Sequence, residues 1–133
     1  MPKHTQISIA MRNEVGSLCR LCGIMARAGV NILGLAIDDC TDEGFVRLIV
    51  DEPKKARQTL DAARVPHQVQ DVLALDLANE PGALQRASAR LAEAGVNIHY
   101  AYGTVGPQAG AGLLVLRVSD LDRAAAILEP ATK

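Results

Sequence analysis

The chain has 133 residues, of which 49% are hydrophobic and 22% are charged, and its formal net charge at pH 7 is −1. This balance is that of a globular protein and excludes a disordered chain. A nearly neutral chain with only 2% aromatic residues lacks the basic surface and the stacking rings that nucleic-acid binding uses. No run of 18 apolar residues is present, so we expect no membrane span.

The N-terminal segment and the number of cysteines indicate the cellular compartment of the protein. Residues 1–6 contain no apolar segment of the kind that a secretory signal requires. The number of cysteines is three, and an odd number fits a reducing compartment better than a disulfide framework. We therefore expect a cytoplasmic protein.

The sequence contains an internal repeat. The segment Asn-Glu-Val-Gly-Ser-Leu at 13–18 returns 66 residues later as Asn-Glu-Pro-Gly-Ala-Leu at 79–84. The segment Ala-Gly-Val-Asn-Ile at 28–32 returns with the same shift at 94–98. Two matches in one register indicate a tandem duplication.

The hydrophobic pattern predicts the same order of elements in both copies. In the first copy it predicts, in chain order, a strand at 7–11, a helix from near Ser17, strands at 32–37 and 45–50, and a helix from near Pro53. In the second copy it predicts a strand at 72–77, a helix from near Ala83, strands at 98–104 and 113–118, and a helix from near Leu121. Residues 65–69 can form a fourth strand in the first copy, whereas the tail at 129–133 is too short for one.

This order of elements, with two helices on one face of an antiparallel sheet, is the ferredoxin-like arrangement. We therefore predict an α+β fold of tandem βαββαβ units, the first over residues 1–70 and the second over residues 71–133. The second unit lacks its last strand in this prediction. A sheet edge without a neighbour must be covered or paired, so we expect a homodimer.

The repeated loops at 13–18 and 79–84 each join a strand to the start of a helix. Free N–H groups and the helix dipole favour negative charge there, so a carboxylate is a natural ligand. The loop glycines allow a close approach of the ligand to the backbone, and Asn13 and Asn79 can both donate and accept hydrogen bonds. The alternative is that these residues only form a turn and begin a helix.

Asn31 and Asn97 precede the second predicted strand of each unit. We expect the fold to bring them near the first loop of the same or an adjacent unit, where two amides could hold the polar atoms of an amino acid. His99 lies on the same side of its strand as Asn97, so it could line this site, and its counterpart is Leu33. The alternative is that each asparagine only accommodates a turn.

The segments 79–84 and 94–98 closely resemble the signature of the ACT domain, and 13–18 with 28–32 resembles a second copy. The resemblance covers nearly the whole chain. It implies two ferredoxin-like regulatory domains that bind small molecules, usually amino acids. Domains of this type typically pair side by side and hold their effectors at the interface of the pair.

The resemblance also implies candidate ligand-binding residues. They are Asn13, Glu14, Val15, Gly16, Ser17, Leu18, Asn31 and Ile32 in the first unit, and Asn79, Glu80, Pro81, Gly82, Ala83, Leu84, Asn97, Ile98 and His99 in the second. The usual loop proline is kept at Pro81 and replaced by Val15. Met11 and Leu77 stand where serine-sensing members carry a histidine, so a more apolar amino acid fits at least as well as serine.

The pair Cys19 and Cys22 forms a C-x-x-C motif, which can carry a thiol function or a metal. The second copy has no cysteine at the matching positions, which favours a structural role for the pair. The three histidines lie on separate segments without ligand spacing. We therefore predict neither a metal nor a cofactor.

No nucleophile and base recur together in both copies, so we predict no enzymatic activity. The sequence indicates a small amino-acid sensor that acts by shifting a population of conformations. One alternative is a regulatory subunit of a separate amino-acid biosynthetic enzyme. The alternative from another class is a thiol or metal carrier that uses the C-x-x-C motif.

Overall fold

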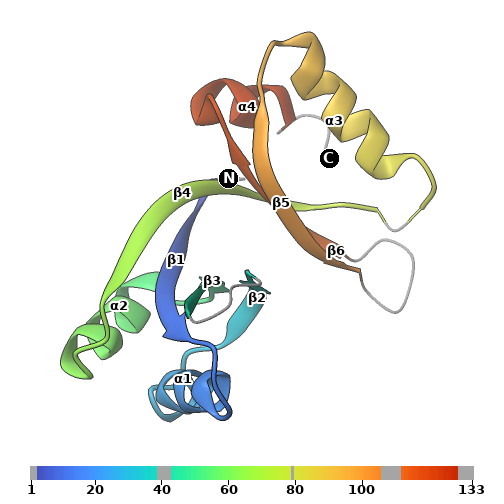
Figure 1. The fold of residues 1–133 in the computed structure, drawn as a ribbon. Helices are drawn as coiled ribbons and strands as arrows, with labels where there is room; N and C mark the ends of the chain where they lie inside the picture. The colour runs from blue at the N-terminus through green and yellow to red at the C-terminus, as the bar shows by residue number, and fades with distance from the viewer. Residues whose placement is uncertain (1–2, 39–42, 79, 106–111, 129–133) are drawn as a thin grey trace. The chain divides into compact units, whose positions relative to one another are not determined.

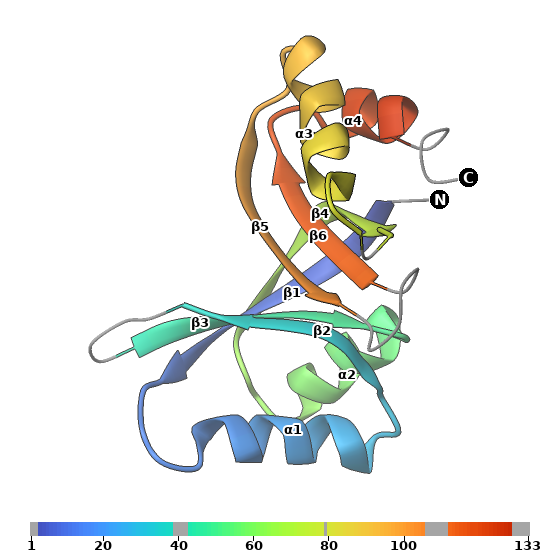
Figure 2. The ribbon, with the colours of Figure 1, turned by 90° about the vertical axis from the view of Figure 1, so that its right-hand side faces the viewer.

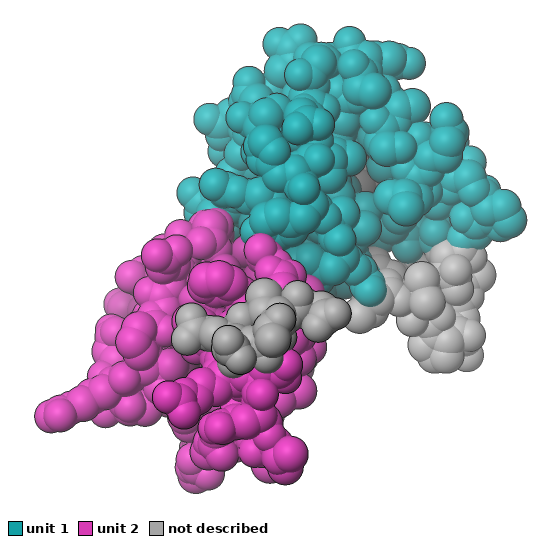
Figure 3. Space-filling view, in the orientation of Figure 1, with its two compact units in different colours: residues 1–4, 71–133 teal, residues 5–70 magenta. Residues whose placement is uncertain are grey.

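The computed structural model describes residues 3–38, 43–78, 80–105 and 112–128. The chain divides into two compact units, which Figure 3 colours separately. The N-terminal unit consists of residues 5–70 (magenta, unit 2 in the figure), and the C-terminal unit of residues 1–4 and 71–133 (teal, unit 1).

The described part of the N-terminal unit contains two helices and four strands (Figure 1). The elements are β1 (Lys3–Arg12), α1 (Ser17–Arg27), β2 (Ile32–Ile37), β3 (Glu43–Val50), α2 (Pro53–Ala62) and β4 (His67–Asp76), of which β1 and β4 also continue into the other unit. The strands neighbour one another in the order β2-β3-β1-β4, and β3 is antiparallel to both β1 and β2. Figure 2 shows α1 and α2 on the same face of these strands.

Helical and strand periodicity together build the core of this unit. Alternate residues of β1 and β3 point to one face, where α1 and α2 each present residues four positions apart. The buried core consists of Ile7, Ile9, Leu21, Met25, Val30, Val46, Leu48, Val50, Ala56 and Leu60.

The C-terminal unit repeats this construction. Its further elements are α3 (Ala83–Glu93), β5 (Ile98–Val105), β6 (Gly112–Val118) and α4 (Leu121–Leu128), and its strand order is β1-β4-β6-β5. The strand β6 is antiparallel to β4 and to β5. Its core consists of Leu73, Leu75, Ala87, Leu91, Val96, Leu114, Leu116, Val118, Ala124, Ala125 and Leu128. The predicted α+β class with ferredoxin-like units is confirmed.

The chain's own N-terminus covers the sheet edge that we expected to be open. No strand follows α4 in the described residues, which end at Leu128. The place beside β4 is taken by β1, whose residues Lys3 and His4 belong to the C-terminal unit. The Lys3 ammonium forms an ion pair with Asp122 of α4, and the hydrogen bond in this pair raises the pKa of Lys3. The remaining sheet edges are therefore β2 and β5.

The structure also joins two elements that we predicted separately. The expected strands at 65–69 and 72–77 form one continuous strand, β4, over His67–Asp76. No glycine or proline interrupts this segment, so the backbone has no local reason to leave the extended conformation. None of the described helices is long and apolar enough to cross a membrane.

A small polar network links β1 to β4 within the N-terminal unit. Gln6 is completely buried and Ser8 is nearly so. The Oε1 atom of Gln70 accepts hydrogen bonds from Gln6 Nε2 at 3.2 Å and from Ser8 Oγ at 2.8 Å. One acceptor thus serves two donors that lie on the neighbouring strand.

We expect Gln70→Leu to lower the free energy of unfolding by about 1–3 kcal/mol, because buried donors lose their acceptor. The matched control is Gln68→Leu, since Gln68 lies on the same strand and is exposed. Urea unfolding followed by circular dichroism measures both variants. Equal stability of the two would contradict a structural role for this network.

Candidate ligand-binding site

The glycines of the two repeated loops have the same backbone conformation. Gly16, directly before α1, has φ of 89°, and Gly82, directly before α3, has φ of 88°. Residues with a side chain rarely adopt this left-handed region, so glycine is required at both places. The N–H of Ser17 donates to the carbonyl of Glu14 at 3.3 Å, and the equivalent bond in the second loop has the same length. The turn is therefore set by the backbone in both copies.

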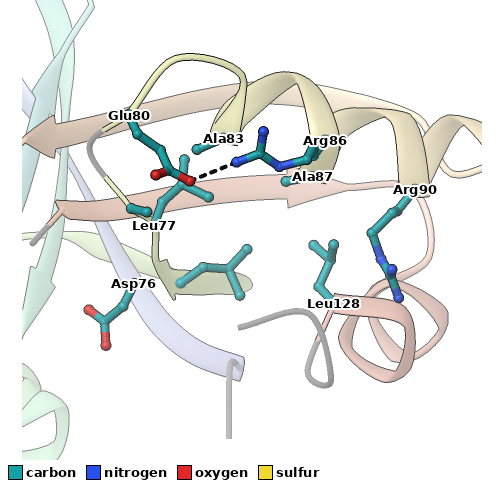
Figure 4. Close-up of a pocket in the computed structure, with 10 residues that line it drawn as sticks. Asp76, Leu77, Glu80, Ala83, Arg86, Ala87, Arg90 and Leu128 are labelled. Atoms are coloured by element: carbon teal, nitrogen blue, oxygen red, sulfur yellow. Dashed lines mark hydrogen bonds and ion pairs between the residues drawn. The ribbon is translucent and has the colours of Figure 1, made fainter. Parts of the chain in front are cut away.

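A glutamate and an arginine close each loop. Arg20 Nη2 lies 3.2 Å from Glu14 Oε1 in the first loop. Arg86 Nη2 lies 2.8 Å from Glu80 Oε1 in the second, as the dashed line in Figure 4 marks. Each arginine stands in the first helical turn, where its guanidinium adds positive charge to the helix N-terminus.

The loop glycines also make room for these arginines. A Cβ atom on Gly82 would lie 2.8 Å from Arg86 Nη1, and one on Gly16 would lie 3.4 Å from Arg20 Nη1. Neither arginine was among the residues predicted for the site. The available signal was their position, because the two occupy the same place in the two copies of the repeat.

The side chains of the expected loop residues point in different directions. Ser17 and Ala83, the first helical residues, are buried. Val15 is 99% exposed and Leu84 is 53% exposed, so neither is held in the core. The remaining described loop residues lie at the surface, except for the half-buried Leu18 (Asn13, Glu14, Gly16, Glu80, Pro81 and Gly82 are exposed). Asn79 lies outside the described residues.

The backbone groups of Asn31 and Asn97 form hydrogen bonds with the residues that directly follow β3 and β6. The N–H of Asn31 donates to Asp51 Oδ1 at 2.9 Å, and the carbonyl of Asn31 accepts from the N–H of Asp51 at 3.0 Å. Asn97 makes the same pair of bonds with the Oγ and the N–H of Ser119, both at 2.9 Å. Both asparagines are exposed, and Asn97 Nδ2 lies 3.5 Å from Nδ1 of the exposed His99.

Within each unit, the loop and the asparagine lie at opposite ends of the first helix and are therefore far apart. The loop precedes α1 and Asn31 follows it, and this helix of 11 residues is about 16 Å long. Figure 2 shows the two connections at opposite ends of α1. The same holds for α3 and Asn97, since α3 also has 11 residues. Ile32 and Ile98 are half-buried and pack against the cores of their units.

A pocket of about 460 Å³ lies behind the second loop, within the C-terminal unit. It is enclosed by the end of β4, the first turns of α3 and the last residue of α4 (Figure 4). Its lining residues are Leu75, Asp76, Leu77, Ala78, Glu80, Ala83, Arg86, Ala87, Arg90 and Leu128. Two of the expected site residues, Glu80 and Ala83, belong to this set.

The two cysteines of the C-x-x-C motif are free thiols on α1. Cys19 is exposed and Cys22 is half-buried. No group of three histidine, cysteine or carboxylate side chains in the described part of the chain could hold a metal ion. Cys40 lies outside the described residues.

The chain was compared with solved structures and with curated proteins. Protein BT0572 from Bacteroides thetaiotaomicron has 28% sequence identity and a TM-score of 0.89, over 98% of this chain and 89% of that one. The regulatory subunit of aspartate kinase from Thermus thermophilus has 14% identity and a TM-score of 0.66, over 100% and 95% of the two chains. The aspartokinase alpha and beta subunits have 15% identity and a TM-score of 0.60, over 98% and 92%. No curated protein matches the chain.

A family model extends the likeness to the sequence itself. The model described as an ACT domain pair matches residues 3–130. The predicted ACT resemblance is thus confirmed over nearly the whole length of the chain. The protein therefore belongs to the family of ACT domain pairs.

Proposed function

We propose that the protein is a regulatory sensor of a free amino acid, without catalytic activity of its own. The observation that carries this proposal is the ACT domain pair over residues 3–130, because ACT domains are regulatory domains that usually bind amino acids. Ligand binding would favour one conformational or assembly state over another, which is how a protein without chemistry can regulate.

The loop geometry supports a carboxylate ligand. A helix N-terminus without a side-chain cap, a left-handed glycine and an arginine coincide in each loop, and an uncapped N-terminus favours an anion. Arg86 and Glu80 are both more than half exposed, and exposed ion pairs contribute little. A ligand carboxylate can therefore replace the glutamate at small cost. We place the candidate sites at the loops 13–18 and 79–84.

Asn31 and Asn97 remain part of the proposed sites, together with Ile32, Ile98 and His99. Because α1 and α3 separate each asparagine from the loop of its own unit, we propose that a ligand held by both contacts two ACT domains. A homodimer supplies this arrangement when the loop comes from one protomer and the asparagine from its partner.

The exposed edge of β2 supports such a homodimer. This strand, Ile-Leu-Gly-Leu-Ala-Ile, contains no charged residue and no proline. Leu33, Leu35 and Ile37 are 44%, 36% and 47% exposed. Edge strands that stay in solvent usually carry charges, proline or bulges against pairing. The register of β2 against β3 shifts only at its start, between Ile32 and Gly34, and the exposed Leu35 and Ile37 lie beyond this point. We therefore propose that β2 pairs with a second copy of the chain.

An alternative within regulation is a subunit of a separate amino-acid biosynthetic enzyme. The regulatory subunit of aspartate kinase from Thermus thermophilus is matched over 95% of its length, so a chain of this size and fold occurs as a regulatory subunit. Co-purification of such an enzyme, with activity that changes when the protein is removed, would favour this alternative.

We expect at least one of the twenty amino acids to raise the melting temperature. A ligand at 100 times its Kd adds about 2.7 kcal/mol of stability, which corresponds to roughly 3–5 °C for a protein of this size. Thermal-shift assays with each amino acid at millimolar concentration make the test. The absence of any shift across the panel would contradict the sensor.

We expect Asn97→Ala to weaken binding of the amino acid found in that panel by about 10- to 150-fold, since hydrogen bonds to a charged ligand contribute about 1.5–3 kcal/mol each. Asn31→Ala should have a smaller effect, because only the second unit has Pro81 and His99. Both variants should fold, because the structural bonds of these asparagines are made by their backbones. Calorimetry compares the two affinities, and equal losses would refute the asymmetry.

We expect the wild-type protein to have twice the chain mass of 14.1 kDa at micromolar concentration. Leu35→Lys places a charge on the β2 edge and should yield the mass of one chain. The control is Ala101→Lys, at the matching position of β5. Light scattering measures all three. Dissociation by the control alone would assign the interface to β5 instead.

A further inference from the structure

We propose that the pocket behind the second loop binds the side chain of a branched aliphatic carboxylate, and that Arg86 binds the carboxylate group. The ligand is a branched-chain amino acid or the 2-oxo acid with the same carbon skeleton. This inference rests on the proposed function, because it specifies the class of ligand and places its side chain within one unit.

The floor of the pocket is apolar and already formed. Leu75, Ala87 and Leu128 line it, and they are only 3%, 8% and 1% exposed. A volume of about 460 Å³ lies at the lower end of the range for small-molecule sites. An aliphatic chain of four carbons would lose its contact with water there without requiring a polar partner.

The repeat indicates that this space is specific to the C-terminal unit. The position of Ala87 corresponds to Leu21 in the N-terminal unit, and Leu21 is buried in the core of that unit. The position of Arg90 corresponds to Ile24, which packs against the same core. A leucine at position 87 would therefore fill the space in the way that the other copy fills it.

Charged groups surround the opening of the pocket. Figure 4 shows Arg86 turned toward Glu80 on the loop side, and Asp76 at the end of β4. Arg90 lies at the far end, where its Nη2 donates to the carbonyl of Ile127 at 2.9 Å and so holds the end of α4.

Arg86 is the group best placed to bind the ligand carboxylate. It adjoins the N-terminus of α3, and its partner Glu80 shows that a carboxylate fits at 2.8 Å from Nη2. A guanidinium can bind a carboxylate through two parallel hydrogen bonds. Once displaced, Glu80 would lie with Asp76 near the ligand and attract an ammonium group. We therefore expect the amino acid to bind more tightly than the 2-oxo acid.

Calorimetry on the full chain tests the ligand class with four probes. They are L-leucine, 4-methyl-2-oxopentanoate, L-leucinamide without the carboxylate, and glycine without the aliphatic chain. We expect leucine to bind, and leucinamide and glycine to bind at least about 10-fold more weakly. Tighter binding of the oxo acid than of leucine would keep the carboxylate site and identify the oxo acid as its ligand.

Two variants with matched controls locate the site. Ala87→Leu fills the pocket and Arg86→Gln removes the guanidinium, and each should weaken leucine binding by about 10-fold or more. Ala92→Leu on the exposed side of α3 and Arg123→Gln on α4 carry the same substitutions away from the pocket, and should change affinity less than about twofold. Circular dichroism checks folding, and Arg86 is exposed, so its variant remains informative if Ala87→Leu fails to fold.

The outcomes separate this inference from the proposed function. Leucine binding that is unchanged in both Ala87→Leu and Arg86→Gln would overturn the pocket assignment. Binding of another amino acid, but neither of leucine nor of its oxo acid, would overturn the ligand class and leave the sensor standing. If none of the twenty amino acids binds and the oxo acid does not bind either, both proposals are wrong.

Discussion

The structure of each unit depends on a glycine that turns the chain from the first strand into the first helix. With φ near +88°, Gly16 and Gly82 occupy a conformation that other residues rarely adopt. This turn lets the first residue of each helix point into the core, and no side chain caps the N-terminus of either helix. The missing Cβ also admits the guanidinium of Arg20 or Arg86. One backbone constraint thus produces both the helix packing and the placement of the loop arginine on which the proposed carboxylate site depends.

A comparison of the two copies distinguishes residues that the fold requires from residues that a ligand would require. Both copies keep the loop glycine, the closing ion pair and the backbone bonds of the asparagine before the second strand. They differ behind the loop, where Leu21 stands in one copy and Ala87 in the other. Substituting alanine for a core leucine normally leaves a cavity and costs stability. An alanine at position 87 is explained if a ligand side chain occupies the space that a leucine would fill. This is the physical basis for placing the ligand side chain there.

The sequence predicted the elements well, because each produces a local hydrophobic period, and the repeated motif identified the family. It did not predict that β4 is one strand or that Lys3 and His4 complete the C-terminal unit. Pairing between segments so far apart in the chain leaves no local pattern. The separation of Asn31 from its loop follows from the length of α1, which the motif spacing alone does not convey. The loop motif did not indicate Arg20 and Arg86, although the two occupy the same position in the two copies of the repeat. Asn79 lies outside the described residues, so its expected role in the site stays a prediction.

The strand β4 carries residues of the proposed pocket and also a residue of the polar network in the N-terminal unit. Its end carries Leu75 and Asp76, which line the pocket, and its middle carries Gln70, which accepts hydrogen bonds from Gln6 and Ser8. Five residues of extended chain separate Gln70 from Leu75, a distance of about 17 Å. The strand that would contact the ligand therefore also carries the acceptor of the Gln70 network. Regulation requires that the ligand interact differently with two states of the protein. The residues of the proposed pocket and the acceptor of the Gln70 network lie on one continuous strand, so β4 is the element in which we expect two such states to differ.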